Sequence, residues 1–167
     1  MISRNKKLIT AAMILIAAFL VQGASAITID SFDMSISENG NTELVFDYSL
    51  SAMEKFAVFM KIADPAEELQ KAIDERTDQE VEVLDATSSS ASFLVPGYIT
   101  PVSSSEGMTY TTPSIDFSKA EEILKGYWFA SLITIDLSPE TTTITFPDGY
   151  SESFTNEIEI PSVTHTV

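Results

Sequence analysis

The chain contains no cysteine and a single histidine, His165, among its 167 residues. Without cysteine the protein forms no disulfide bond, carries no lipid on a cysteine and has no thiol nucleophile. One histidine without cysteine also cannot supply the usual ligands of a zinc site. A fold without disulfides must be held together by its apolar core, which a content of 44% hydrophobic residues allows.

Basic residues are scarce too. The chain has nine Lys and Arg residues and 25 Asp and Glu residues, which gives a net charge of −16. A surface this negative repels nucleic acid and anionic lipid, so the composition excludes a nucleic-acid-binding protein. The acidity favours solubility outside the cell, and an affinity for cations is the alternative interpretation.

The motifs of nucleophilic and nucleotide chemistry are missing as well. The sequence has no Gly-Xaa-Ser-Xaa-Gly turn and no glycine-rich phosphate loop. His165 lies close to the C-terminus, where chain ends are usually solvated, and this placement argues against a catalytic base. We therefore assign no catalytic, cofactor-binding or metal-ligating residue, and the sequence favours a non-enzymatic protein without a cofactor.

Residues 1–26 have the order of a secretory signal peptide, with cleavage expected after Ala26. Three basic residues precede an apolar run over residues 8–21, and the small triplet 24–26 follows it. The alternative is an uncleaved anchor, but a helix of this length rises only about 21 Å against a hydrocarbon core of roughly 30 Å. We expect a secreted protein, or one on the outer face of the cell envelope, without membrane insertion after cleavage.

Removal of the signal peptide would leave one domain, residues 27–167. The removed segment carries three of the nine basic residues and none of the acidic ones, so the remaining domain has a net charge of −19.

The domain begins with a predicted β-hairpin. Apolar residues alternate over 27–36, with a slip at Asp30-Ser31 that indicates a β-bulge, and again over 43–50. Asn39-Gly40 between them supplies residues that tolerate the positive φ angles of a tight turn.

Helices are predicted at three capping boxes. These begin at Ser51, at Asp64 with Pro65 in the first helical position, and at Ser118, whose helix ends at Gly126. Further strands are predicted at 80–86, 92–95, 127–137, 141–146 and 153–160. The expected fold is α+β, with a mostly antiparallel sheet or sandwich and two to three short helices packed against it. Residues 66–98 and 120–150 also resemble each other and could form two helix-hairpin units.

Two loops and one aromatic group are the candidate ligand sites. The acidic loops 37–43 and 74–78 offer oxygen atoms for calcium, although neither has the EF-hand order of ligands. Trp128 is expected in the core, and the alternative is an outward sugar-binding platform with Tyr98 or Tyr150 on nearby loops. The Ser/Thr clusters near 87–90, 103–105 and 109–112 are interpreted as polar turns and solvent-facing strand positions.

These observations favour an exported, acidic, non-enzymatic binding or structural module with an envelope protein or a glycan as its partner. A small secreted hydrolase that uses only carboxylates is one alternative, since 25 acids provide many pairs. A subunit that adds an edge strand from 153–160 to a neighbour is another.

Overall fold

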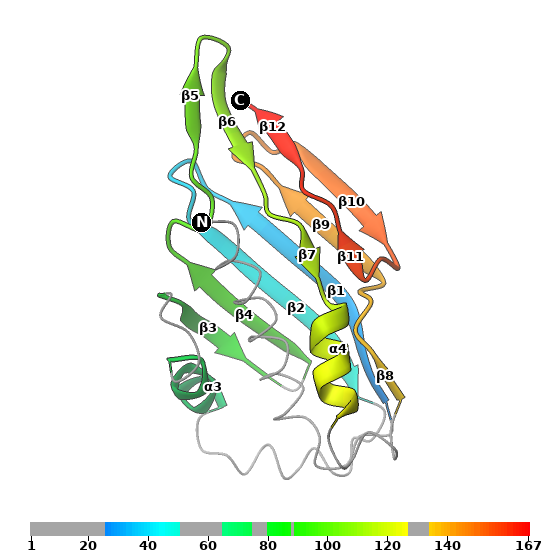
Figure 1. Cartoon of the computed structure of the whole chain (residues 1–167). Coiled ribbons are helices and arrows are strands. Elements are labelled where there is room, and N and C mark those ends of the chain that lie inside the picture. The colour runs from blue at the N-terminus through cyan, green and yellow to red at the C-terminus, as the bar shows by residue number, and fades with distance from the viewer. Residues whose placement is uncertain (1–25, 51–64, 75–79, 88, 127–133) are drawn as a thin grey trace.

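The structure is a computed structural model, and it describes residues 26–50, 65–74, 80–87, 89–126 and 134–167 (Figure 1). The predicted helix at Ser51 and most of the predicted strand 127–137, including Trp128, lie outside these ranges. In the described ranges no helix is long and apolar enough to cross a membrane.

The N-terminal hairpin is confirmed. Strand β1 (Ala26–Ile36) pairs antiparallel with β2 (Thr42–Leu50), and the register shifts between Ile29 and Ser31, where the bulge was predicted. Along both strands the alternate apolar side chains are buried. This burial of one face explains why the period of two is visible in the sequence.

The hairpin is the centre of a seven-stranded sheet with the order β10-β9-β1-β2-β4-β3, in which β8 also pairs with β1. Its other strands are β3 (Glu82–Ala86), β4 (Ser90–Val95), β8 (Thr134–Asp136), β9 (Thr141–Thr145) and β10 (Ser151–Thr155). Strands β8 and β9 both run parallel to β1, so the sheet is mixed. The two segments that resemble each other in sequence differ here. In 66–98 the strands β3 and β4 form an antiparallel hairpin, whereas in 120–150 the strands β8 and β9 each pair with β1 and not with each other.

A second layer covers the apolar face of this main sheet. Its strands are β5 (Val102–Ser104), β6 (Gly107–Thr111), β7 (Ile115–Asp116), β11 (Glu159–Ile160) and β12 (Thr164–Thr166). They pair as β12-β6-β5 and β11-β7; in Figure 1 β7, β11 and β12 lie in front of the main sheet, and the β5–β6 hairpin extends beyond its upper end. Pro113 and Pro161 lie between the two pairings, where a residue without an N–H interrupts the ladder.

The predicted α+β class is wrong, because the described chain is largely all-β. The described helices are two short ones, α3 (Pro65–Asp74) and α4 (Ser118–Lys125), both at predicted positions. After residue 101 the chain also forms more strands than predicted: β5 and β6 arise from Ser/Thr clusters that were interpreted as polar turns and solvent-facing strand positions, and β12 forms where a solvated chain end was expected. The predicted strand 153–160 is also divided, since the chain turns at Asn156, which has a φ of 53°, between β10 and β11.

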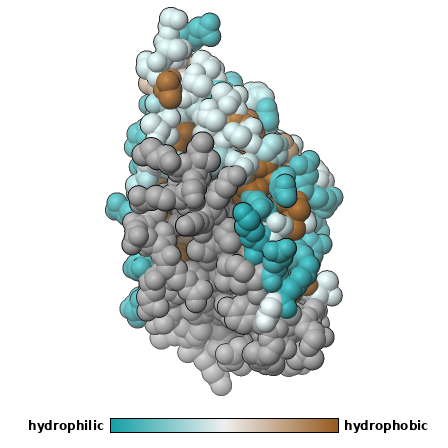
Figure 2. Space-filling view, viewed as in Figure 1, coloured by the Kyte–Doolittle hydropathy of each residue, from teal (hydrophilic) through white to brown (hydrophobic). Residues whose placement is uncertain are grey.

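The core joins the two layers through aromatic rings. Phe117, which follows β7, is fully buried, and its ring meets that of Phe32 edge-on at 5.5 Å. Phe32 in turn stacks on Phe46 at 4.6 Å. Edge-to-face and offset contacts of this kind stabilise aromatic pairs beyond the area they bury. The exposed strand positions are mainly polar by contrast. On the face seen in Figure 2 the described surface is mainly teal and white, with fewer brown residues.

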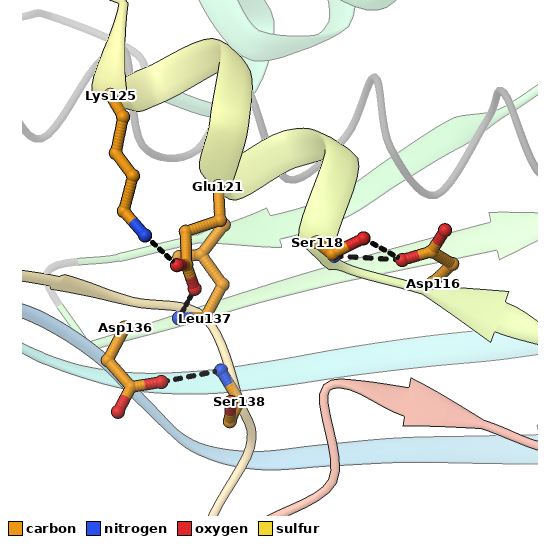
Figure 3. A network of polar contacts seen from close by, with 7 residues as sticks. All are labelled: Asp116, Ser118, Glu121, Lys125, Asp136, Leu137 and Ser138. Carbon is orange, nitrogen blue, oxygen red and sulfur yellow. Dashed lines mark hydrogen bonds and ion pairs between the residues drawn. The ribbon is translucent and has the colours of Figure 1, made fainter.

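The start of α4 differs from the predicted capping box, as Figure 3 shows. Asp116 Oδ1, two residues upstream, accepts the hydrogen bonds of the Ser118 backbone N–H and hydroxyl. Glu121 pairs with Lys125 and also accepts from the Leu137 N–H at 3.3 Å. Glu121, the acid expected to cap the helix, thus attaches α4 to the residue after β8. The polar groups of this network bond to one another.

Candidate functional site

His165 lies in a strand, which differs from the expectation of a solvated chain end. It is the central residue of β12 and pairs with Tyr110 of β6. Its side chain is 22% exposed, and its Nε2 lies 2.8 Å from Asp148 Oδ2 in the turn between β9 and β10. The histidine therefore connects the second layer to a turn of the main sheet.

The electrostatics of this contact fix the direction of the hydrogen bond. An ionised carboxylate accepts hydrogen bonds only, so Nε2–H of His165 is the donor. This bond lowers the pKa of Asp148 below its ordinary value of 3.8, and the backbone N–H of Tyr150, which donates to Asp148 Oδ1 at 3.0 Å, lowers it further. The carboxylate is consequently negative at neutral pH.

Tyr150 completes the site. Its ring stacks on the imidazole of His165, with centroids 4.2 Å apart and planes 14° from parallel. Its hydroxyl donates to Glu152 Oε1 at 3.0 Å, and this bond, followed by the charge of Glu152, raises the pKa of Tyr150. Beneath the pair the buried Phe146 lies 5.1 Å from the imidazole. The stacking on His165, the hydroxyl bond to Glu152 and the backbone bond to Asp148 hold the tyrosine in place, and 43% of its surface is exposed.

Two exposed apolar residues, Val167 after the end of β12 and Met108 on β6, belong to the same pair of strands as His165. Val167 is on the same side of the strand as His165, because alternate side chains of a strand share a face. It exchanges two backbone hydrogen bonds of 2.9 Å with Met108, the residue opposite it. Val167 and Met108 are 46% and 36% exposed. We call these two residues with Tyr150 and His165 the Tyr150–His165 surface; the carboxylates of Asp148 and Glu152, which bond to His165 and Tyr150, lie beside these two rings.

The Tyr150–His165 surface can stack a flat or apolar ligand face and can accept hydrogen bonds at its edge. Tyrosine suits such a role because its ring is apolar while its hydroxyl bonds to a polar group. The lowered pKa of Asp148 is opposite to the raised pKa that a general acid needs at neutral pH.

The other two residues of the predicted sugar platform, Tyr98 and Trp128, are not placed at the Tyr150–His165 surface. Tyr98 is 3% exposed, and burial raises its pKa. Trp128 lies outside the described residues. Only Tyr150 of the three is thus placed at this surface. Its partners His165 and Asp148 were not predicted, since they are 17 residues apart and meet only through packing of the layers.

In the first predicted calcium loop, 37–43, the side-chain oxygen atoms of Asn39 and Asn41 accept hydrogen bonds from the protein itself. Asn39 Oδ1 accepts from the hydroxyl of Ser37 at 2.8 Å and from the N–H of Asn41 at 3.0 Å. Asn41 Oδ1 accepts from the N–H of Gly97 at 2.9 Å and so fixes the loop after β4. Of the loop 74–78, only Asp74 is described, and no group of three or more metal-ligating acids or histidines occurs among the described residues.

Comparison with protein-family models, with curated proteins and with solved structures gave no match for this chain.

Proposed function

We propose that the protein is an exported, non-enzymatic binding module of the extracellular space or cell envelope, and that the Tyr150–His165 surface is where it binds a glycan. Export is supported by the charged, apolar and small-residue order of residues 1–26. Binding is supported above all by one observation, the exposed and rigidly held ring of Tyr150. Exposed aromatic residues with fixed conformations are typical of recognition surfaces because they lose little entropy on binding.

A sugar ring fits the chemistry of this surface. The C–H face of a pyranose is apolar and can pack on the tyrosine ring and on Val167, while its hydroxyls can donate to Asp148 and Glu152. The negative charge at the edge favours neutral glycans and amino sugars over acidic ones, because like charges repel. An ammonium group of an amino sugar would also be attracted to the face of the tyrosine ring.

Calorimetric titration of the exported protein with three probes tests this function: a chitosan oligosaccharide, cellohexaose and a polygalacturonate oligosaccharide. We expect the amino-sugar chain to bind most tightly, the neutral chain next and the acidic chain not at all. Binding of the acidic probe alone, or of none of the three, would contradict the proposed ligand class.

A further inference from the structure

The last strand of the main sheet, β10, has an open edge. It pairs with β9 on one side, and no described strand pairs with its other side. In Figure 1 it forms one border of the sheet, and β3 forms the opposite border.

The backbone groups on the open edge of β10 can be identified from the ladder. At its two ends, the Phe146 N–H donates to the Tyr150 carbonyl at 2.8 Å and the Asn156 N–H donates to the Glu140 carbonyl at 3.2 Å. Antiparallel partners alternate between hydrogen-bonded and non-hydrogen-bonded pairs, so even-numbered residues of this strand bond to β9. The N–H and C=O groups that point away from the sheet belong to Ser151, Ser153 and Thr155.

The opposite edge is blocked. The side-chain amide of Gln70 in α3 donates to the Val81 carbonyl at 2.7 Å, and its oxygen accepts from the Val83 N–H at 2.7 Å. A register shift between Val83 and Asp85 further interrupts this strand. Bulges, acidic side chains and a covering helix are the means by which proteins prevent pairing at an edge. Strand β10 has none of these among the described residues, apart from Glu152.

We propose that β10 pairs antiparallel with β10 of a second copy across a two-fold axis at Ser153. The register is self-complementary, since Ser153 lies opposite itself and Ser151 lies opposite Thr155 of the second copy. Glu152 lies opposite Phe154 of the second copy, so the two carboxylates do not face each other. The three outward residues then form three hydrogen-bonded pairs, each with two N–H···O=C bonds.

A second copy fits this edge better than an open chain of copies. Pairing of identical edges about a two-fold axis closes after two subunits, and the other edge of the main sheet, β3, is blocked. The net charge of each domain opposes association, while the strand itself contributes only one charge. Dimerisation is therefore expected to be strengthened by salt, which screens charge repulsion.

Analytical ultracentrifugation of the exported protein tests the proposal over a range of protein concentrations, in about 0.1 M and about 1 M salt. We expect a monomer–dimer equilibrium that shifts to the dimer in high salt. The variant Ser153→Lys places two like charges opposite each other at the two-fold axis, and should weaken the dimer about tenfold or more. Ser153 is exposed on the sheet, so this variant is expected to fold.

The control is Ser103→Lys, which makes the same change of charge at an exposed position of β5, a strand at the edge of the other sheet. It should leave the dimer intact. A wild-type protein that stays monomeric at about 1 mM in high salt would overturn the proposal, as would a dimer that Ser103→Lys weakens and Ser153→Lys does not. Glycan binding is measured separately, by calorimetry.

Discussion

His165 donates its Nε2–H to Asp148 Oδ2 at 2.8 Å, and this contact joins the C-terminal strand β12 to the turn between β9 and β10. The same histidine carries the stacked ring of Tyr150. This side chain thus links the second layer to a turn of the main sheet and contacts the exposed aromatic ring of the candidate binding surface.

The first prediction concerns pH. The pKa of Asp148 is lowered by folding, so the unfolded chain binds its proton more tightly. The contact therefore stabilises the fold at pH values above 3.8, and this contribution is lost as the pH falls through the lower pKa of the folded state. Asp148→Asn should reduce the free energy of unfolding in denaturant titrations at pH 6, and its difference from wild type should shrink near pH 3.

Glu106→Gln removes one negative charge from an exposed position in the β5–β6 turn and is the matched control. It should leave the free energy of unfolding close to that of wild type at both pH values. A difference for Asp148→Asn that grows toward low pH would contradict the assigned direction of the pKa shift.

The second prediction compares two buried threonines, Thr142 and Thr112, each 1% exposed. The hydroxyl of Thr142 hydrogen-bonds to none of the described residues, whereas Thr112 Oγ1 accepts from the Val163 N–H at 2.9 Å. Thr142→Val removes an unsatisfied polar group and should raise the free energy of unfolding by about 1 kcal/mol. Thr112→Val leaves a buried N–H without its acceptor and should lower it by about 1–3 kcal/mol. Thermal and denaturant unfolding of both variants measure this, and a change of the same sign in both would refute the explanation.

The third prediction compares Gly40 with Gly149, which have similar φ angles of 80° and 87°. A Cβ at Gly40 would lie 1.9 Å from the Ile99 carbonyl oxygen, while a Cβ at Gly149 meets nothing within 4 Å. Gly149→Ala should therefore lose only the roughly 1–2 kcal/mol of an unfavourable backbone conformation. Gly40→Ala must also displace the loop after β4, and should lose more than about 3 kcal/mol. Equal melting temperatures for the two variants would show that the loop is not packed as described.

The sequence predicted those parts of the fold in which one strand face is buried by apolar side chains alone. Strands β1 and β2 satisfy this condition, and their hairpin and bulge were predicted correctly. In the second layer the inward positions include Thr112 and His165, which interrupt the apolar alternation, and β5, β6, β7 and β12 were therefore not assigned as strands. The turn at Asn156 was missed because neither proline nor glycine marks it.

The candidate site could be predicted only in part. Tyr150 was identified as an aromatic residue on a turn, but nothing local indicates that it stacks on His165. That contact depends on how β12 lies over the main sheet, which follows from the packing of the whole second layer. Likewise, the parallel pairing of β9 with β1 depends on long-range packing, and nothing in the expected mostly antiparallel sheet indicated it.

The proposed binding role depends on the ring of Tyr150, and titration calorimetry of its variants with the chitosan oligosaccharide is the most direct test. Tyr150→Ala should weaken binding about tenfold or more, equivalent to about 1.4 kcal/mol. Tyr150→Phe keeps the ring and should retain most of the affinity. Val102→Ala shortens an exposed side chain on β5, outside the Tyr150–His165 surface, and should bind as wild type does. Equal affinities for wild type and Tyr150→Ala would contradict the account.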